Sequence, residues 1–172
     1  GNMKDVLLQI SGIAIAAVGM TLVILTGGID LSVGSLLALA GCAGALAGLS
    51  IAESEAAWLT SWGGHVVIGF AVAVAVGALC GLANGVMITK IPLQPFITTL
   101  GVMGVARGLA YHVSHSSPVE VVPGMRLIAT ARPWGIPFPI FLMLAIYLLG
   151  WVVLRYTRFG RNVFAIGGNE EA

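Results

Sequence analysis

The chain of 172 residues is strongly apolar: hydrophobic residues make up 58% of it, charged residues only 9%, and its mean hydropathy is +1.01. A soluble domain carries about 25% charged residues, so this composition indicates an integral membrane protein. The net charge of +1 excludes a basic surface for nucleic acid, and neither a Gly-rich phosphate loop nor a strand–helix alternation indicates nucleotide binding. Any energy source is therefore expected on another protein.

Five apolar stretches are long enough to cross a bilayer, because about 18 to 20 apolar residues span the hydrocarbon as a helix. They cover residues 6–25, 31–51, 66–89, 96–113 and 139–156. The sequence therefore predicts an all-α fold, a polytopic transmembrane helix bundle with about five spans. No signal peptide pattern begins the chain, and we expect residues 1–172 to be a fragment of a larger transmembrane domain.

The first two spans are separated by the sequence TGGID. Gly27 and Gly28 are predicted to end the first helix in the left-handed region. Asp30 is predicted to cap the next helix by accepting the backbone N–H of Ser32 or Val33. A carboxylate in lipid costs at least a few kcal/mol unless it is satisfied. Capping alone and capping combined with a position beside a solute path are both open.

Small residues recur at helical spacing within the spans. A glycine every fourth residue lets another backbone approach closely, so these positions predict packing stripes. Cys42 and Cys80 lie inside apolar stretches and are interpreted as small packing residues rather than a disulfide. The stripes are Gly44 with Gly48, then Gly77, Gly81 and Gly85, and then Gly104 with Gly108.

Four polar residues within the spans need partners in lipid: Asn84, Thr98, Thr99 and Arg107. Arg107 is the most demanding because its guanidinium stays charged. It is expected either to form a structural ion pair or carbonyl contact near the outer interface, or to contact solute directly.

No catalytic or metal site is predicted. His112 and His115 are spaced i, i+3, but they straddle the end of a span, and no cysteine or paired carboxylate accompanies them. Residues 114–137 contain four prolines, which exclude a continuous helix and favour an irregular surface segment.

The basic residues predict the orientation. Arg155, Arg158 and Arg161 adjoin the last span, and such clusters favour the cytoplasmic side. Lys90 is then cytoplasmic as well, whereas the start of the chain, Glu53, Glu55 and the proline-rich segment lie outside.

Three segments resemble the permease subunit of bacterial ABC importers for simple sugars, the ribose-type family. They are AVGMTLVILTGGIDLSVGSLLALAG at 17–41, NGVMITKIPLQPFITTLGVMGVARGLAY at 84–111 and TRFGRNVFAIGGNEEA at 157–172. The resemblance implies a multi-pass protein of the bacterial inner membrane, with a second permease subunit and a central translocation path. It also implies two cytoplasmic ATPase subunits, which would bind ATP and Mg while this chain holds no cofactor, and a periplasmic sugar-binding protein.

The resemblance also assigns candidate residues by position. Residues 157–172 are similar to the family's cytoplasmic coupling region, which docks on the ATPase. The candidates for lining the path are Gly28, Asp30, Ser32, Asn84, Thr98 and Thr99; those for coupling are Arg158, Gly160, Gly167, Gly168, Asn169, Glu170, Glu171 and Ala172.

Three alternatives remain open. The nearest is a permease of the related branched-chain amino acid group. The second is a passive channel or secondary carrier that uses Asp30 as a proton or cation site. The third is a purely structural membrane subunit.

Overall fold

The computed structural model describes residues 2–54 and 63–168, which contain seven α-helices and one short 3-10 helix but no strand. The predicted all-α fold is confirmed for these residues. The elements are α1 (Asn2–Leu25), α2 (Val33–Ala52), α4 (Gly64–Thr89), α5 (Pro95–Val113), α6 (Pro123–Thr130), η1 (Pro133–Gly135), α7 (Phe138–Tyr156) and α8 (Arg158–Gly168).

Among the described helices, four are long and apolar enough to cross a membrane: α1 from Met3 onward, α2, α4 and α7. Helix α5 has 19 residues but is not among the four. Its polar members, above all Arg107, lower its mean hydropathy. The predicted multi-pass architecture is thus confirmed, with α5 as a fifth long helix of more polar character.

The proline-rich segment is more regular than predicted. The prolines do exclude a continuous helix, but α6 begins at Pro123 and η1 at Pro133. Proline fits the first turn of a helix, where its missing N–H has no intrahelical acceptor. The expectation of an irregular segment is therefore wrong for α6 and η1.

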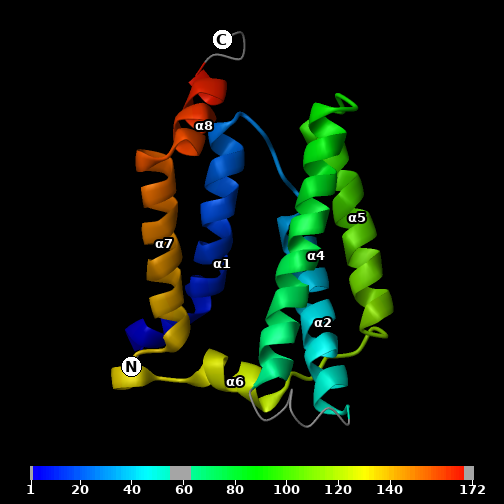
Figure 1. The fold of residues 1–172 in the computed structure, drawn as a ribbon, viewed down its shortest axis with the longest axis vertical. Helices are drawn as coiled ribbons and strands as arrows, with labels where there is room; N and C mark the ends of the chain where they lie inside the picture. Colours follow the sequence, from blue (N-terminus) through cyan, green and yellow to red (C-terminus); the bar gives the residue numbers. More distant parts are fainter. Residues whose placement is uncertain (1, 55–62, 169–172) are drawn as a thin grey trace. The chain divides into compact units, whose positions relative to one another are not determined.

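The chain forms two compact units, residues 1–29 with 128–172 and residues 30–127. In the first, α1 and α7 lie side by side and run in the same direction, and α8 packs at the end where both finish (Figure 1). At the other end of this unit, the ammonium of Lys4 donates to the carbonyl oxygen of Gly135 at 2.7 Å.

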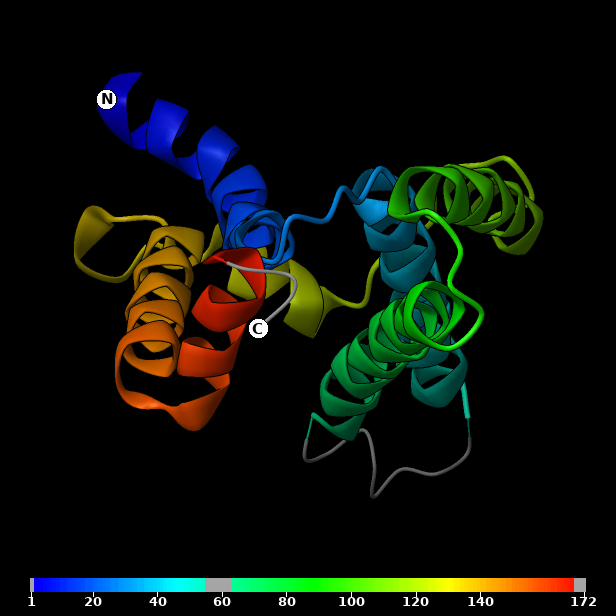
Figure 2. The same cartoon turned by 90° about the horizontal axis from the view of Figure 1, so that it is seen from above.

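In the second unit, α2 packs against both α4 and α5, and Figure 2 shows the three helices from above. The close approach of α2 and α4 depends on glycine. A Cβ added at Gly44 would lie 2.6 Å from the carbonyl oxygen of Gly69 and 2.9 Å from Cβ of Ala73. The predicted packing role of Gly44 and Gly48 is confirmed, since Gly48 lies against the carbonyl oxygen of His65 in the same way.

The other glycine stripes do not pack within the described residues. An added Cβ would meet nothing within 4 Å at Gly77, Gly81, Gly85, Gly104 or Gly108. Their packing role stays a prediction.

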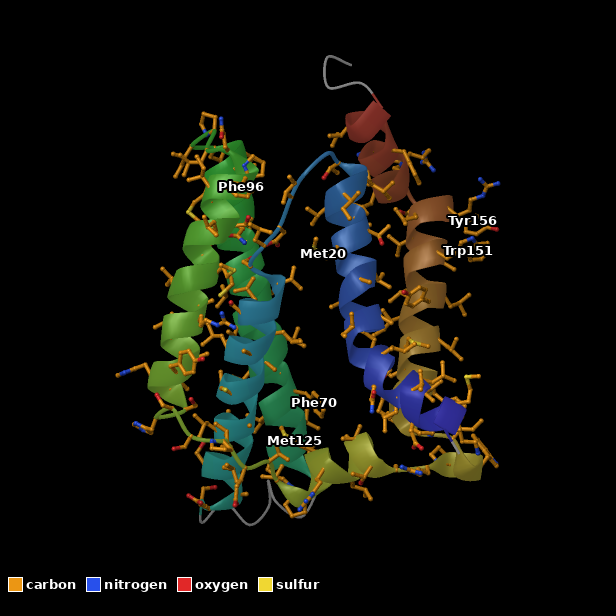
Figure 3. All side chains as sticks on the ribbon, turned by 180° about the vertical axis from the view of Figure 1, so that it is seen from behind. Met20, Phe70, Phe96, Met125, Trp151 and Tyr156 are labelled. Carbon is orange, nitrogen blue, oxygen red and sulfur yellow. The ribbon has the colours of Figure 1, made fainter. Side chains whose placement is uncertain are left out.

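Helix α6 inserts a side chain beside the α2–α4 crossing. The methyl group of Met125 lies 3.1 Å from the position of an added Cβ at Gly48, and it also contacts Gly69 (Figure 3). Val122, which is 1% exposed, closes the same junction next to Gly48. A second apolar cluster joins α2 to α5 through Leu39, Ala106 and Ala110, and Cys80 packs against it as predicted.

Candidate functional site

The break after α1 is a regular helix C-terminus. The N–H of Gly28 donates to the carbonyl oxygen of Val23 at 2.9 Å, and the N–H of Gly27 donates to that of Ile24 at 3.0 Å. These two bonds define a Schellman motif, in which the residue at the Gly27 position is left-handed. Gly27 has φ of +74°, a conformation that side chains with a Cβ rarely adopt. The prediction that this glycine pair ends the first helix is confirmed, with the left-handed residue at Gly27.

Asp30 organises the start of α2. Its Oδ1 accepts the backbone N–H of Ser32 at 2.7 Å and the hydroxyl of Ser32 at 2.6 Å. The predicted bond from the Ser32 N–H is therefore confirmed. The N-cap position is Ser32 itself, whose carbonyl oxygen accepts the N–H of Leu36 at 2.9 Å. Asp30 is therefore not the N-cap residue itself; it lies two residues before the N-cap and binds it.

Asn84 of α4 joins this arrangement from 52 residues away. Its Nδ2 donates to Oγ of Ser32 at 3.1 Å, and the two residues are 5% and 0% exposed. Because a carboxylate only accepts, the Ser32 hydroxyl gives its single proton to Asp30 and can only accept from Asn84. Asp30, Ser32 and Asn84 together are called the polar cluster below.

The polar cluster has one unmet acceptor. Oδ1 of Asn84 is buried and has no hydrogen-bond partner among the described residues. An unsatisfied buried acceptor costs about 1–3 kcal/mol, so a donor from a bound solute, water or another segment would be stabilised there.

Thr98 and Thr99 lie in the first turns of α5 and are 6% and 1% exposed. Their hydroxyls donate to the carbonyl oxygens of Gln94 at 3.1 Å and Pro95 at 2.8 Å. Such bonds to the preceding turn satisfy a hydroxyl inside its own helix. Their predicted role as wall groups stays a prediction.

Arg107 lines a cavity of about 200 Å³ between α2 and α5. The polar groups beside it are those of Ser35, Tyr111 and Ser114. Arg107 has no hydrogen bond or ion pair with a residue in the described parts of the chain, so its predicted ion pair stays a prediction. The sequence signal for this cavity is the helical spacing of Arg107, Tyr111 and Ser114, which places them on one side of α5 and its C-terminal cap.

The predicted coupling region begins with α8, which folds back against α1 and α7. Gly160 is buried against the carbonyl group of Leu154, and its N–H donates to Oγ1 of Thr157 at 3.2 Å. Gly167 lies against the carbonyl group of Leu25, at the end of α1 where the glycine break starts. Among the other candidates, Arg158 and Gly168 are exposed, whereas Asn169, Glu170, Glu171 and Ala172 lie outside the described residues.

The arrangement in the described residues suits weak polar contacts rather than covalent chemistry. Within residues 2–54 and 63–168, no group of three or more His, Cys, Asp or Glu side chains is placed to hold a metal ion. The uncharged polar groups are the Ser32 hydroxyl and the Asn84 amide near the helix break, and the hydroxyls of Ser35, Tyr111 and Ser114 along the α2–α5 cavity.

Nearly the whole chain aligns with a family model and with known proteins. The family model described as "Branched-chain amino acid transport system / permease component" matches residues 2–172. The ribose import permease protein RbsC of Escherichia coli K12 is 40% identical over 177 residues, which is 99% of this chain and 51% of that protein. RbsC of Bacillus subtilis is 37% identical over 174 residues, covering 99% and 50%, respectively. The L-arabinose transport system permease protein AraH of E. coli K12 is 39% identical over 172 residues, covering 99% and 49%.

The chain thus spans about half the length of the curated relatives it matches. No solved structure matches it.

Proposed function

The chain belongs to the family of permease components of branched-chain amino acid transport systems, and from this premise we propose that it forms part of the membrane-spanning subunit of an ATP-driven importer for a simple sugar. The relatives named for ribose and arabinose favour a sugar over a branched-chain amino acid, although the family description mentions only the latter.

The polar cluster is the observation that carries the proposal. Within it, the buried and uncharged pair of Ser32 and Asn84 links the start of α2 to α4, the half-buried Asp30 carboxylate holds Ser32, and the amide oxygen of Asn84 is left as an acceptor. A neutral, hydroxyl-rich solute needs such weak contacts, because a tight charged site would slow its release. We therefore assign Gly28, Asp30, Ser32, Asn84, Thr98 and Thr99 to the path, with Asn84 as the group that meets the solute or a water next to it.

The energy is proposed to come from ATP and Mg on a cytoplasmic partner. Nucleotide binding there would shift the permease between two conformations by its differential affinity for them. Helix α8 and the residues after it would contact that ATPase, and a periplasmic binding protein would deliver the sugar to the inner-membrane complex. Packing of Gly167 against the end of α1 supports this coupling, since a displacement of α8 would reach the glycine break directly.

An uptake assay tests the proposal. The full-length permease is reconstituted in proteoliposomes with its ATPase and binding protein, and the uptake of labelled ribose, arabinose and leucine is measured with ATP inside. We expect uptake of a sugar that requires ATP and is abolished by an ATPase inactivated in its nucleotide site. Uptake of leucine instead would refute the sugar assignment.

The same assay addresses the ion-coupled alternative. In the importer proposal the Asp30 carboxylate only holds Ser32 at the start of α2, through two bonds to its Oδ1, and carries no coupling ion. We therefore expect uptake to persist when proton and sodium gradients are collapsed. Uptake without ATP that follows an ion gradient would overturn the importer proposal.

A further inference from the structure

A pocket of about 370 Å³ lies between the end of α7 and α8. Two of its lining residues are arginines, Arg155 and Arg161, and the other three are apolar or aromatic: Trp151, Leu154 and Phe164. A pair of guanidinium groups over an apolar floor matches a ligand with an anionic head and a hydrocarbon tail.

The pocket lies at the end of a candidate membrane span, the depth at which hydrocarbon is expected to give way to lipid headgroups. Helix α7 is a candidate membrane span that ends at Tyr156, so Arg155 is in its last turn. Trp151 and Tyr156 form an edge-to-face pair with ring centroids 5.4 Å apart, and they project from the same end of α7 (Figure 3). Tryptophan and tyrosine are enriched at this depth because their rings are apolar and their polar atoms reach water.

An apolar stripe leads from the arginines along α7 into the span. Leu144, Leu148 and Trp151 precede Arg155 at spacings of three or four residues, which places all four on one face of the helix. Leu144, Leu148 and Trp151 are 57%, 61% and 55% exposed, respectively. An acyl chain laid along this stripe would cover it and bring the phosphate of its lipid to Arg155.

We propose that the α7–α8 pocket binds an anionic phospholipid, with the phosphate between Arg155 and Arg161 and an acyl chain along Leu144, Leu148 and Trp151. Arginine suits this role because its planar guanidinium binds phosphate oxygens through two parallel hydrogen bonds. Neither arginine forms an ion pair with another described residue, so the donors of both remain available in this part of the chain. The proposal is independent of the transported solute.

The apolar stripe decides between a lipid and a soluble anion. Free phosphate would bind the two arginines, but it has no apolar part that could cover the exposed leucines and Trp151. An acidic segment of a soluble protein would likewise cover only the arginines. A lipid satisfies both parts of the site, and each basic residue beside an anionic lipid surface contributes about fivefold to binding.

Fluorescence quenching tests the proposal in the full-length permease. Every tryptophan except Trp151 is replaced by phenylalanine, and the protein is reconstituted in vesicles that contain brominated phosphatidylglycerol or brominated phosphatidylcholine. Quenching of Trp151 gives the ratio of the two association constants. We expect phosphatidylglycerol to be preferred, and R155Q/R161Q to lower this preference by about fivefold or more.

Two variants serve as controls. K90Q/R132Q removes the same number of charges from residues that do not line the pocket, and it should therefore change the preference by less than about twofold. R155K/R161K keeps the charges but loses the paired hydrogen bonds, so its preference should fall between those of the parent and R155Q/R161Q, which separates loss of binding from misfolding.

An unchanged ratio in R155Q/R161Q, or an equal loss in K90Q/R132Q, would overturn the proposal. Inorganic phosphate is also titrated into the protein in pure phosphatidylcholine vesicles, where a change in Trp151 emission would assign the pocket to a soluble anion instead. Failure of both brominated lipids to quench Trp151 would mean that protein covers the pocket and would overturn the proposal as well.

Discussion

Replacement of Ser32 by alanine is the sharpest test of the polar cluster. Its Oγ donates to Asp30 at 2.6 Å and accepts from Asn84 at 3.1 Å, and the side chain is fully buried. A hydrogen bond to a charged group contributes about 1.5–3 kcal/mol and a neutral one about 1 kcal/mol, so Ser32→Ala should lower the free energy of unfolding by about 3 kcal/mol. Asp30→Asn retains an acceptor for both bonds from Ser32 and should cost only about 1 kcal/mol.

The measurement is unfolding of the purified permease by SDS in mixed micelles, followed by circular dichroism. Ser50→Ala is the matched control, because the exposed Ser50 hydroxyl bonds only to the Ala47 carbonyl oxygen of its own helix, and it should stay within about 0.5 kcal/mol of the parent. The double mutant of Ser32 and Asn84 should show a coupling energy of about 1 kcal/mol. A cost for Ser32→Ala below that of Asp30→Asn would refute the reasoning.

Three further predictions concern packing and charge. Gly44→Ala should destabilise the protein by about 1–3 kcal/mol because the added methyl group meets α4, whereas Gly41→Ala on the same helix meets nothing within 4 Å and should not. Arg107→Gln should change the free energy of unfolding by less than about 0.5 kcal/mol, because no described bond is lost. Gly167→Ala should release α8 from α1 and expose residues 157–168 to limited proteolysis, whereas Gly168→Ala, which meets nothing within 4 Å, should leave the cleavage rate unchanged.

Each of these has a clear contrary result. Equal costs at Gly44 and Gly41 would mean that the α2–α4 contact is looser than the structure indicates. A loss of several kcal/mol in Arg107→Gln would identify a carboxylate partner elsewhere in the assembled protein. Equal cleavage of the Gly167 and Gly168 variants would contradict the docking of α8 on α1.

The local features of the helix break were predictable from sequence. Gly27 ends α1 because a left-handed residue favours glycine, and Asp30 binds the Ser32 N–H two residues away. Both depend on backbone rules that act over a few residues. The packing role of Gly44 was predictable because Gly44 and Gly48 are four residues apart, and two residues without side chains on one helix face allow another helix to approach closely.

The partners of these residues were not predictable. The bond from Asn84 to Ser32 spans 52 residues, and nothing in the spacing indicates which two polar groups of different spans meet. The packing role of Met125 could not be predicted either, because Met125 lies in a proline-rich segment for which the sequence predicts an irregular conformation. Tertiary contacts of this kind depend on how helices are placed, and residue spacing along one chain does not reveal that placement.

The crossing of α2 and α4 has a mechanical consequence. The backbones of α2 and α4 meet at Gly44 and Gly69, and Met125 fills the space beside them, so no side chain that could change rotamer separates the two backbones there. Relative motion of the two helices at this point would force a carbonyl oxygen into a Cα. We therefore expect α2 and α4 to move as one rigid body whenever the protein changes conformation, with Ser32 held to them by its bond to Asn84 and bending left to the non-helical residues 26–29.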